Sequence, residues 1–148
     1  MRIARIGSAG HEKPAVVTAN EYILVDSLID DWSRASLEAG AMAKVAAADL
    51  SGLPRVAKGS TRIGSPINRP TKVICVGLNY LGHIKETNAD TPAEPVIFMK
   101  APDSVVGPND DIVIPPNSTA TDYEVELAIV IGKRALYLNS AADSKAHI

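Results

Sequence analysis

The sequence predicts a β-rich α+β protein, and three observations lead to that fold class. Short β-branched runs separated by Gly, Pro and Asn recur along the chain, which is typical of strands joined by tight turns. Apolar residues at helical spacing are concentrated in one stretch, residues 33–49. Strands and helices do not alternate as they do in a βαβ protein. The pattern therefore favours consecutive strands with few helices.

The N-terminal part predicts a small β/α domain. The stretch 33–49 predicts one amphipathic helix with Ser33 as its N-cap, weakened by Gly40. Three short runs ahead of it predict a small antiparallel β element: residues 2–6, 15–19 and 22–26.

A connecting segment follows, because residues 51–70 are rich in Gly, Ser, Pro, Lys and Arg and show little periodicity. We place the domain boundary there, with a small accessory domain at 1–65 and the first part of a second domain at 66–148. Six of the ten prolines fall between Pro92 and Pro116, between short apolar runs. Five strands are predicted in this second part: residues 72–76, 96–99, 105–106, 112–114 and 125–131.

Composition limits the partners and the compartment. Fifteen basic and seventeen acidic residues give a net charge of −2, which argues against nucleic acid as a partner. The longest apolar run, 127–131, is far shorter than a membrane span, so no membrane partner is expected. The one cysteine, Cys75, forms no intrachain disulfide, which fits a reducing, cytoplasmic compartment.

Glu124 and Glu126 are the first candidate site. On a strand, residues two apart point to the same face, so the two carboxylates would lie side by side. Like charges in that arrangement need either solvent or a cation. One reading is the exposed face of an edge strand. The other is an oxygen-ligated divalent metal such as Mg²⁺, Mn²⁺ or Ca²⁺.

His83 and Glu86 are the second candidate site. They follow the predicted strand 72–76, and they share one face of a short helix if Asn79 caps it. A histidine oriented by a carboxylate can deprotonate water near neutral pH. The alternative is an ordinary solvated surface pair, which is the more common situation.

The other polar candidates carry weaker signals. Lys100 ends a predicted strand and could offer a cation to a substrate carboxylate. Cys75 alternates with apolar residues and is predicted to be a small buried hydrophobe. The Asn-Asp-Asp cluster 109–111 indicates a turn.

The ordered motifs resemble those of the fumarylacetoacetate hydrolase family, specifically bacterial members with a small N-terminal domain. The resemblance spans almost the whole chain. Its blocks are Ile74-Cys75-Val76-Gly77-Leu78-Asn79-Tyr80, His83 with Glu86, Pro95-Val96-Ile97-Phe98-Met99-Lys100, Gly107-Pro108-Asn109-Asp110 and Tyr123-Glu124-Val125-Glu126-Leu127.

The resemblance implies a mixed β-roll catalytic domain and a Mg²⁺ or Mn²⁺ cofactor. Glu124 and Glu126 match two metal ligands, and the third, an aspartate, is expected downstream of this chain. His83 and Glu86 match a water-activating dyad on a lid segment, and Lys100 matches a substrate-binding lysine. The implied enzyme is a homodimeric hydrolase or lyase that cleaves carbon–carbon bonds of 2-oxo acids, acylpyruvates or diketo acids.

Three alternatives stay open at this point. The same site suits a hydratase or isomerase of unsaturated oxo-diacids, or a ureidoglycolate lyase. A different class of function is a non-catalytic β domain that binds a partner through unpaired strand edges. The missing third ligand also leads us to expect a C-terminally truncated chain that is inactive by itself.

Overall fold

The computed structural model describes residues Met1–Ile148 and groups them into two compact units. The first unit contains Met1–Asn68 together with Val106–Ile148, and the second contains Arg69–Val105. The proposed division into domains at 1–65 and 66–148 stays a prediction.

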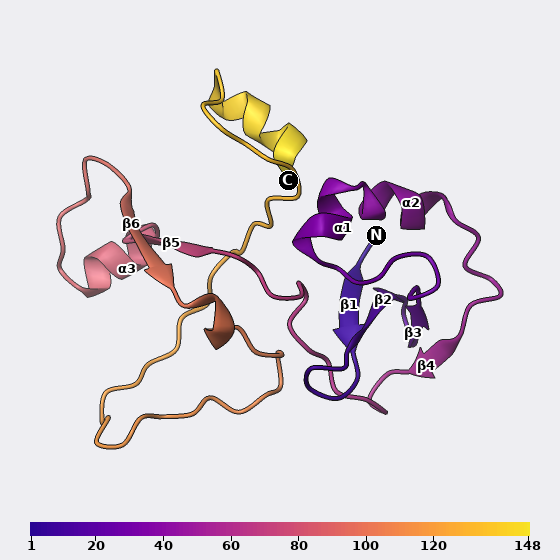
Figure 1. The fold of residues 1–148 in the computed structure, drawn as a ribbon. Helices are drawn as coiled ribbons and strands as arrows, with labels where there is room; N and C mark the ends of the chain where they lie inside the picture. Colours follow the sequence, from indigo (N-terminus) through magenta and orange to yellow (C-terminus); the bar gives the residue numbers. More distant parts are fainter. The chain divides into compact units, whose positions relative to one another are not determined.

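A four-stranded antiparallel sheet in the order β1-β2-β3-β4 forms the centre of the first unit (Figure 1). The three predicted N-terminal strands are present, and the sheet has one further strand at an edge. That strand, β4, lies in the segment predicted to be an unstructured connector, and it pairs with β3. The strand bounds are β1 Ile3–Ile6, β2 Lys13–Val17, β3 Glu21–Leu24 and β4 Arg55–Ala57.

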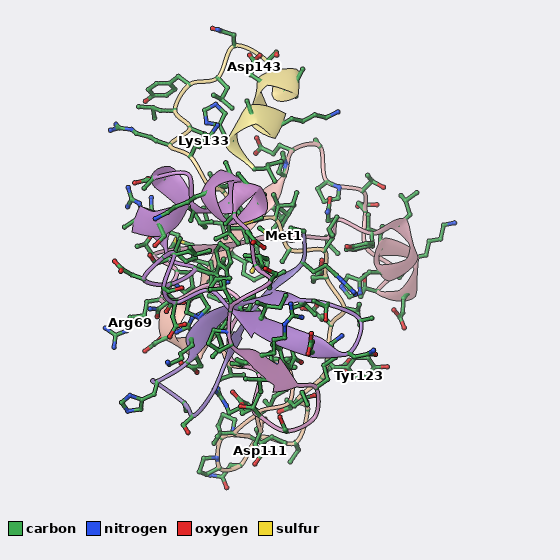
Figure 2. All side chains as sticks on the ribbon, turned by 90° about the vertical axis from the view of Figure 1, so that its right-hand side faces the viewer. Met1, Arg69, Asp111, Tyr123, Lys133 and Asp143 are labelled. Atoms are coloured by element: carbon green, nitrogen blue, oxygen red, sulfur yellow. The ribbon has the colours of Figure 1, made fainter.

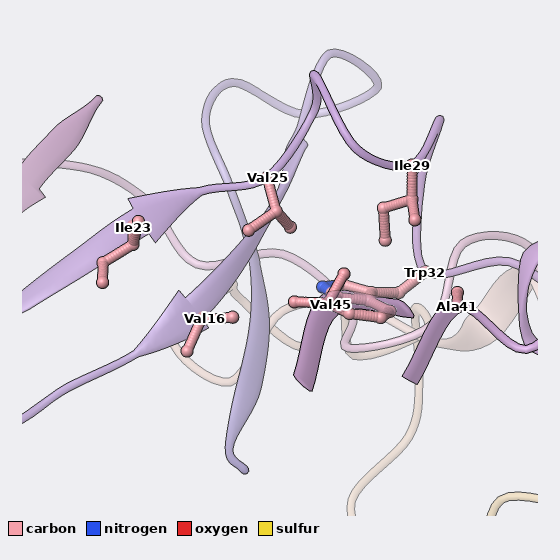
Figure 3. Close-up of a cluster of buried hydrophobic side chains, with 7 residues drawn as sticks. All are labelled: Val16, Ile23, Val25, Ile29, Trp32, Ala41 and Val45. Atoms are coloured by element: carbon pink, nitrogen blue, oxygen red, sulfur yellow. The ribbon is translucent and has the colours of Figure 1, made fainter. Parts of the chain in front are cut away.

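Two buried apolar clusters stabilise this unit. The larger contains Val16, Ile23 and the fully buried Trp32, with the helical residues Ala41 and Val45 packed among them (Figure 3). Trp32 also donates its indole N–H to the Ala15 carbonyl at 3.3 Å, so its polar atom is satisfied. The smaller cluster contains Ala4, Ile6, Ala15 and Tyr22.

The predicted helix over 33–49 is divided into α1, Arg34–Glu38, and α2, Ala41–Ala47. Ser33 is the N-cap of α1, as predicted, and its hydroxyl accepts from the Ser36 N–H at 3.3 Å. Gly40 lies between the helices with φ of +81°, a left-handed conformation that glycine adopts without strain. Gly40 therefore ends the first helix rather than only weakening a single one.

The second unit is an antiparallel ribbon with a short helix between its strands. The helix α3 spans Leu81–Glu86, and Cys75 pairs with Phe98 across the ribbon. Most apolar side chains of the ribbon face solvent, with Ile97 58% and Met99 61% exposed. The remaining elements are β5 Val73–Gly77, β6 Val96–Lys100 and the 3₁₀ turn η1 Pro102–Ser104.

The strands predicted at 105–106, 112–114 and 125–131 are not formed. Their β-branched residues favour extended backbone, but a strand also needs a neighbour for its N–H and C=O groups, and no segment of this chain pairs with them. Across 66–148 the strands are limited to β5 and β6, so only this two-stranded part of the expected sheet is present.

The C-terminal residues form the 3₁₀ helix η2, Ala141–His147, where the sequence begins a helical pattern. The His147 carbonyl accepts from the backbone N–H groups of Gly132 at 2.8 Å and Lys133 at 3.2 Å. Lys133 and Asp143 mark this end of the chain in Figure 2.

None of the helices combines the length and the apolar character needed to cross a membrane.

We expect the 148-residue chain to self-associate when it is expressed alone. Two-stranded ribbons are marginal in water, and this one exposes apolar residues, as does the segment 125–131. Light scattering should show concentration-dependent assemblies, while the emission of Trp32 stays typical of a buried indole because residues 1–68 (the N-terminal unit) have their own core. A monodisperse chain that melts in one cooperative transition would contradict this expectation.

Candidate functional site

The helix α3 carries His83 and Glu86 on neighbouring turns. His83 Nδ1 lies 4.0 Å from Glu86 Oε2, which is within ion-pair range but too long for a hydrogen bond. The two side chains are 45% and 82% exposed. The residue at the N-cap is Tyr80 rather than the predicted Asn79, and no side chain caps the helix. The structure thus brings the predicted dyad together in an open, solvated arrangement.

Lys100 lies in the same unit, at the end of β6. Its ammonium lies 5.8 Å from the centre of the Phe98 ring, which is a cation–π distance. A cleft of about 310 Å³ lies between the turn after β5 and the loop before β6, and Asn79, Ile84 and Glu94 are among its lining residues. Neither His83 nor Glu86 lines this cleft.

Glu124 and Glu126 lie in an exposed segment without assigned secondary structure. The two carboxylates would share one face only on a strand, and no strand is formed there. Their oxygen donors have the chemistry that Mg²⁺ and Mn²⁺ prefer. However, no group of three or more His, Cys, Asp or Glu side chains in the structure is placed to hold a metal ion, so Glu124 and Glu126 do not form a metal centre here.

The most organised polar cluster is one that the sequence did not predict. We call it the charge network, and its centre is the Glu12 carboxylate, whose side chain is only 7% exposed. Glu12 Oε1 accepts from Arg62 Nη1 at 2.6 Å, and Oε2 accepts from Arg5 Nη2 at 3.3 Å and from the Gly10 N–H at 3.1 Å. Its members are Arg5, Glu12, Asp31, Arg62 and Asp110.

Each arginine of the charge network also holds a second carboxylate with two parallel hydrogen bonds. Arg5 binds Asp31 through Nε at 2.8 Å and Nη2 at 2.9 Å. Arg62 binds Asp110 through Nε at 2.7 Å and Nη2 at 2.5 Å. Such forked pairs fix orientation as well as supplying attraction. Directly bonded pairs in the charge network are up to 50 residues apart in sequence, and the network as a whole joins Arg5 to Asp110.

The surroundings favour the ionised forms of Glu12 and Asp110. Burial acts to raise the pKa of Glu12, but the hydrogen bond from Arg62, its backbone contact and the charges of both arginines outweigh burial and hold that pKa below its usual value. The hydrogen bond from Arg62 lowers the pKa of Asp110. An added Cβ at Gly64 would lie 2.7 Å from Glu12 Oε1, so only glycine lets the carboxylate sit there.

One signal in the sequence could have revealed this cluster. Arg5 interrupts an otherwise apolar strand, and it is 6% exposed in the structure. A charged residue inside a core strand requires a charged partner. The identity of that partner was not predictable, because Asp31 lies 26 residues away, in the loop between β3 and α1.

Comparison with known proteins points to one family. Residues 72–148 match the family described as fumarylacetoacetate (FAA) hydrolase C-terminal. The matched range includes α3, Lys100 and the Glu124–Glu126 pair.

Individual relatives agree with this match. The chain is 40% identical over 141 residues to the 2,4-didehydro-3-deoxy-L-rhamnonate hydrolase of Sphingomonas sp. (strain SKA58). The aligned residues cover 94% of this chain and 47% of that protein. It is 47% identical over 96 residues to the human oxaloacetate tautomerase FAHD2A, mitochondrial, and this alignment covers 65% of this chain and 30% of that protein. The chain thus spans at most about half the length of these curated relatives.

A solved structure shares the fold. The fumarylacetoacetate hydrolase of psychrophilic Exiguobacterium antarcticum matches with a TM-score of 0.55 and 34% sequence identity, over 76% of this chain and 39% of that one.

Replacing Glu12 should lower the free energy of unfolding of the N-terminal unit. Glu12→Gln removes the anion that Arg5 and Arg62 share, and because each arginine keeps a second carboxylate the cost should be roughly 1–3 kcal/mol. The matched control is Glu38→Gln, which breaks the exposed Arg34–Glu38 pair and should cost less than about 0.5 kcal/mol. Denaturant titration followed by Trp32 emission measures both, and equal effects would contradict the central role of Glu12.

Acid should lower the free energy of unfolding, as Glu12→Gln does. Because the pKa of Glu12 is lower in the folded state than its ordinary 4.5, its stabilising contribution is complete above that value and is lost as the pH falls through the folded pKa. Glu12→Gln should therefore lose less stability than the wild type between pH 5 and about pH 3.

Proposed function

The chain belongs to the fumarylacetoacetate hydrolase family, and from that premise we propose that it carries part of the active site of a hydrolase or lyase that cleaves carbon–carbon bonds of 2-oxo acids, including acylpyruvates and diketo acids. The observation that carries the proposal is the family match over 72–148, which contains every candidate catalytic residue. The names of the two relatives support small oxo acids as the substrate class.

In this proposal His83 is the general base. Its imidazole takes a proton from water, and Glu86 stabilises the imidazolium that results. The 4.0 Å separation must shorten to hydrogen-bond length when substrate is bound, which the exposed positions of both side chains permit. Lys100 offers its ammonium to a substrate carboxylate.

Glu124 and Glu126 are proposed as two ligands of a divalent cation, Mg²⁺ or Mn²⁺. A bound divalent cation polarises carbonyl oxygens of an oxo acid. The structure gathers no third ligand beside them, and the proton transfer proposed for His83 relies on the residues of α3 alone.

A tautomerase is the second candidate. The relative that is 47% identical over 96 residues is named an oxaloacetate tautomerase. Keto–enol exchange needs a base that moves a proton next to a carbonyl, and His83 would serve that reaction without activating water. The protein is further proposed to act as a cytoplasmic homodimer in its family-length form.

A chimera tests the proposal most directly. In it, this chain replaces the 141 matching residues of the Sphingomonas hydrolase, and the product is assayed with acylpyruvates for hydrolysis and with oxaloacetate for tautomerisation. Turnover of acylpyruvate supports the hydrolase, and turnover of oxaloacetate alone supports the tautomerase. A folded chimera without either activity would favour a partner-binding domain.

His83→Ala in the chimera should lower kcat by about 10²–10⁴-fold, since general-base catalysis contributes about that much. Metal affinity should change little, and Glu86→Gln should show a smaller defect. The control is His11→Ala, which removes an exposed histidine of the N-terminal unit. A wild-type kcat between pH 6 and 8 in His83→Ala would show that the dyad is only a surface pair.

Glu124→Gln or Glu126→Gln in the chimera should abolish metal-dependent turnover and leave the fold intact. Neutralising one carboxylate weakens a hard-cation site and also relieves repulsion between like charges, so the melting temperature without metal should hold or rise slightly. Turnover measured against Mn²⁺ concentration decides: a normal profile in either variant would reject these two residues as ligands.

A further inference from the structure

The turn at residues 107–110 packs directly on the backbone of the N-terminal unit. Gly107 is buried, and a Cβ added there would overlap the Ile63 carbonyl oxygen and lie 3.1 Å from the Gly64 Cα. Its N–H donates to Asp110 Oδ2 at 2.7 Å, and the Asp110 N–H donates back to the Gly107 carbonyl at 3.2 Å. Gly107 is therefore needed for close approach to another segment.

Arg62 holds this turn through its forked pair with Asp110. The same guanidinium donates in the other direction to Glu12 at 2.6 Å and to the Gly7 carbonyl at 3.3 Å. Arg62 thus joins the turn to the charge network. The two paired side chains are 30% and 22% exposed, so the contact is only partly shielded from water.

The other end of the intervening segment is also attached to the N-terminal unit. The Asn68 N–H donates to the Trp32 carbonyl at 2.7 Å, and Asn68 forms an isolated bridge with Ser33. Between Asn68 and Gly107 lies the second unit, Arg69–Val105. The residues that flank the second unit on both sides are therefore hydrogen-bonded within the first unit.

We propose that Arg62 and Asp110 form an ionic clasp that docks the 107–110 turn on the N-terminal unit and so closes residues 69–105 into a loop anchored at both ends. The charged groups form a chain of ion pairs in which Asp110 pairs with Arg62, Arg62 with Glu12, Glu12 with Arg5, and Arg5 with Asp31. Closing both ends reduces the conformations open to the segment. The clasp does not depend on the proposed function, although the loop that it closes carries His83, Glu86 and Lys100.

Hydrogen exchange on the 148-residue chain tests the clasp. The wild type should protect the peptide covering 105–111. Asp110→Asn keeps an oxygen for the Gly107 N–H but loses the charge pair, and exchange in that peptide should rise roughly tenfold while peptides of β1 and β2 stay unchanged. The matched control, Asp111→Asn, removes the neighbouring exposed carboxylate and should exchange like the wild type.

Two further variants separate the clasp from a purely local turn. Gly107→Ala should raise the same exchange by steric displacement without changing any charge. In an Arg62→Gln background, Asp110→Asn should add nothing further. Trp32 emission confirms that the N-terminal unit stays folded, and where Arg62→Gln unfolds it the Asp110→Asn and Gly107→Ala results decide. Unchanged exchange at 105–111 in Asp110→Asn, or an equal rise in Asp111→Asn, would overturn the proposal.

Discussion

The carboxylate of Glu12, held between the guanidinium groups of Arg5 and Arg62, is the constraint on which the N-terminal unit depends. Removing one charge from water is costly, and here two opposite charges and a backbone N–H replace the lost hydration. The same requirement dictates the neighbours, because Gly64 has to lack a side chain for the carboxylate to fit. A sheet edge, a loop and a distant turn are thereby oriented by one polar contact.

Packing and candidate chemistry are separated along the chain. The buried clusters lie almost entirely in the first 68 residues, whereas the family match begins at residue 72. His83, Glu86 and Lys100 consequently sit on a ribbon with little core of its own. Residues that bind substrate benefit from exposure, but a two-stranded ribbon contributes little stability of its own.

Local rules predicted the local features well. The alternation of apolar residues identified β1 to β3, and Ser33 was recognised as a cap because its hydroxyl needs only a partner three residues away. The effect of Gly40 was underestimated, since a left-handed residue ends a helix instead of only weakening it. The strand predicted at 125–131 was wrong for a non-local reason: apolar β-branched residues form a strand only beside another strand.

For the candidate site as well, contacts within one element were predictable and contacts between distant segments were not. Sequence spacing placed His83 near Glu86, because three residues on one helix determine that distance. Nothing in the spacing could place Asp110 beside Arg62, which is 48 residues earlier. Pairings of this kind depend on how whole segments fold together, and a single sequence does not encode them in any local pattern.

The position of Arg62 ahead of its partner also sets an order of assembly during protein synthesis. Residues 1–68 are contiguous, so their sheet and core can form on the ribosome as soon as they emerge. At roughly 5–20 residues per second, Asp110 is added several seconds after Arg62. During that interval Arg62 has Glu12 and the Gly7 carbonyl as partners, and the 107–110 turn does not yet cover the Ile63 carbonyl and the Gly64 Cα.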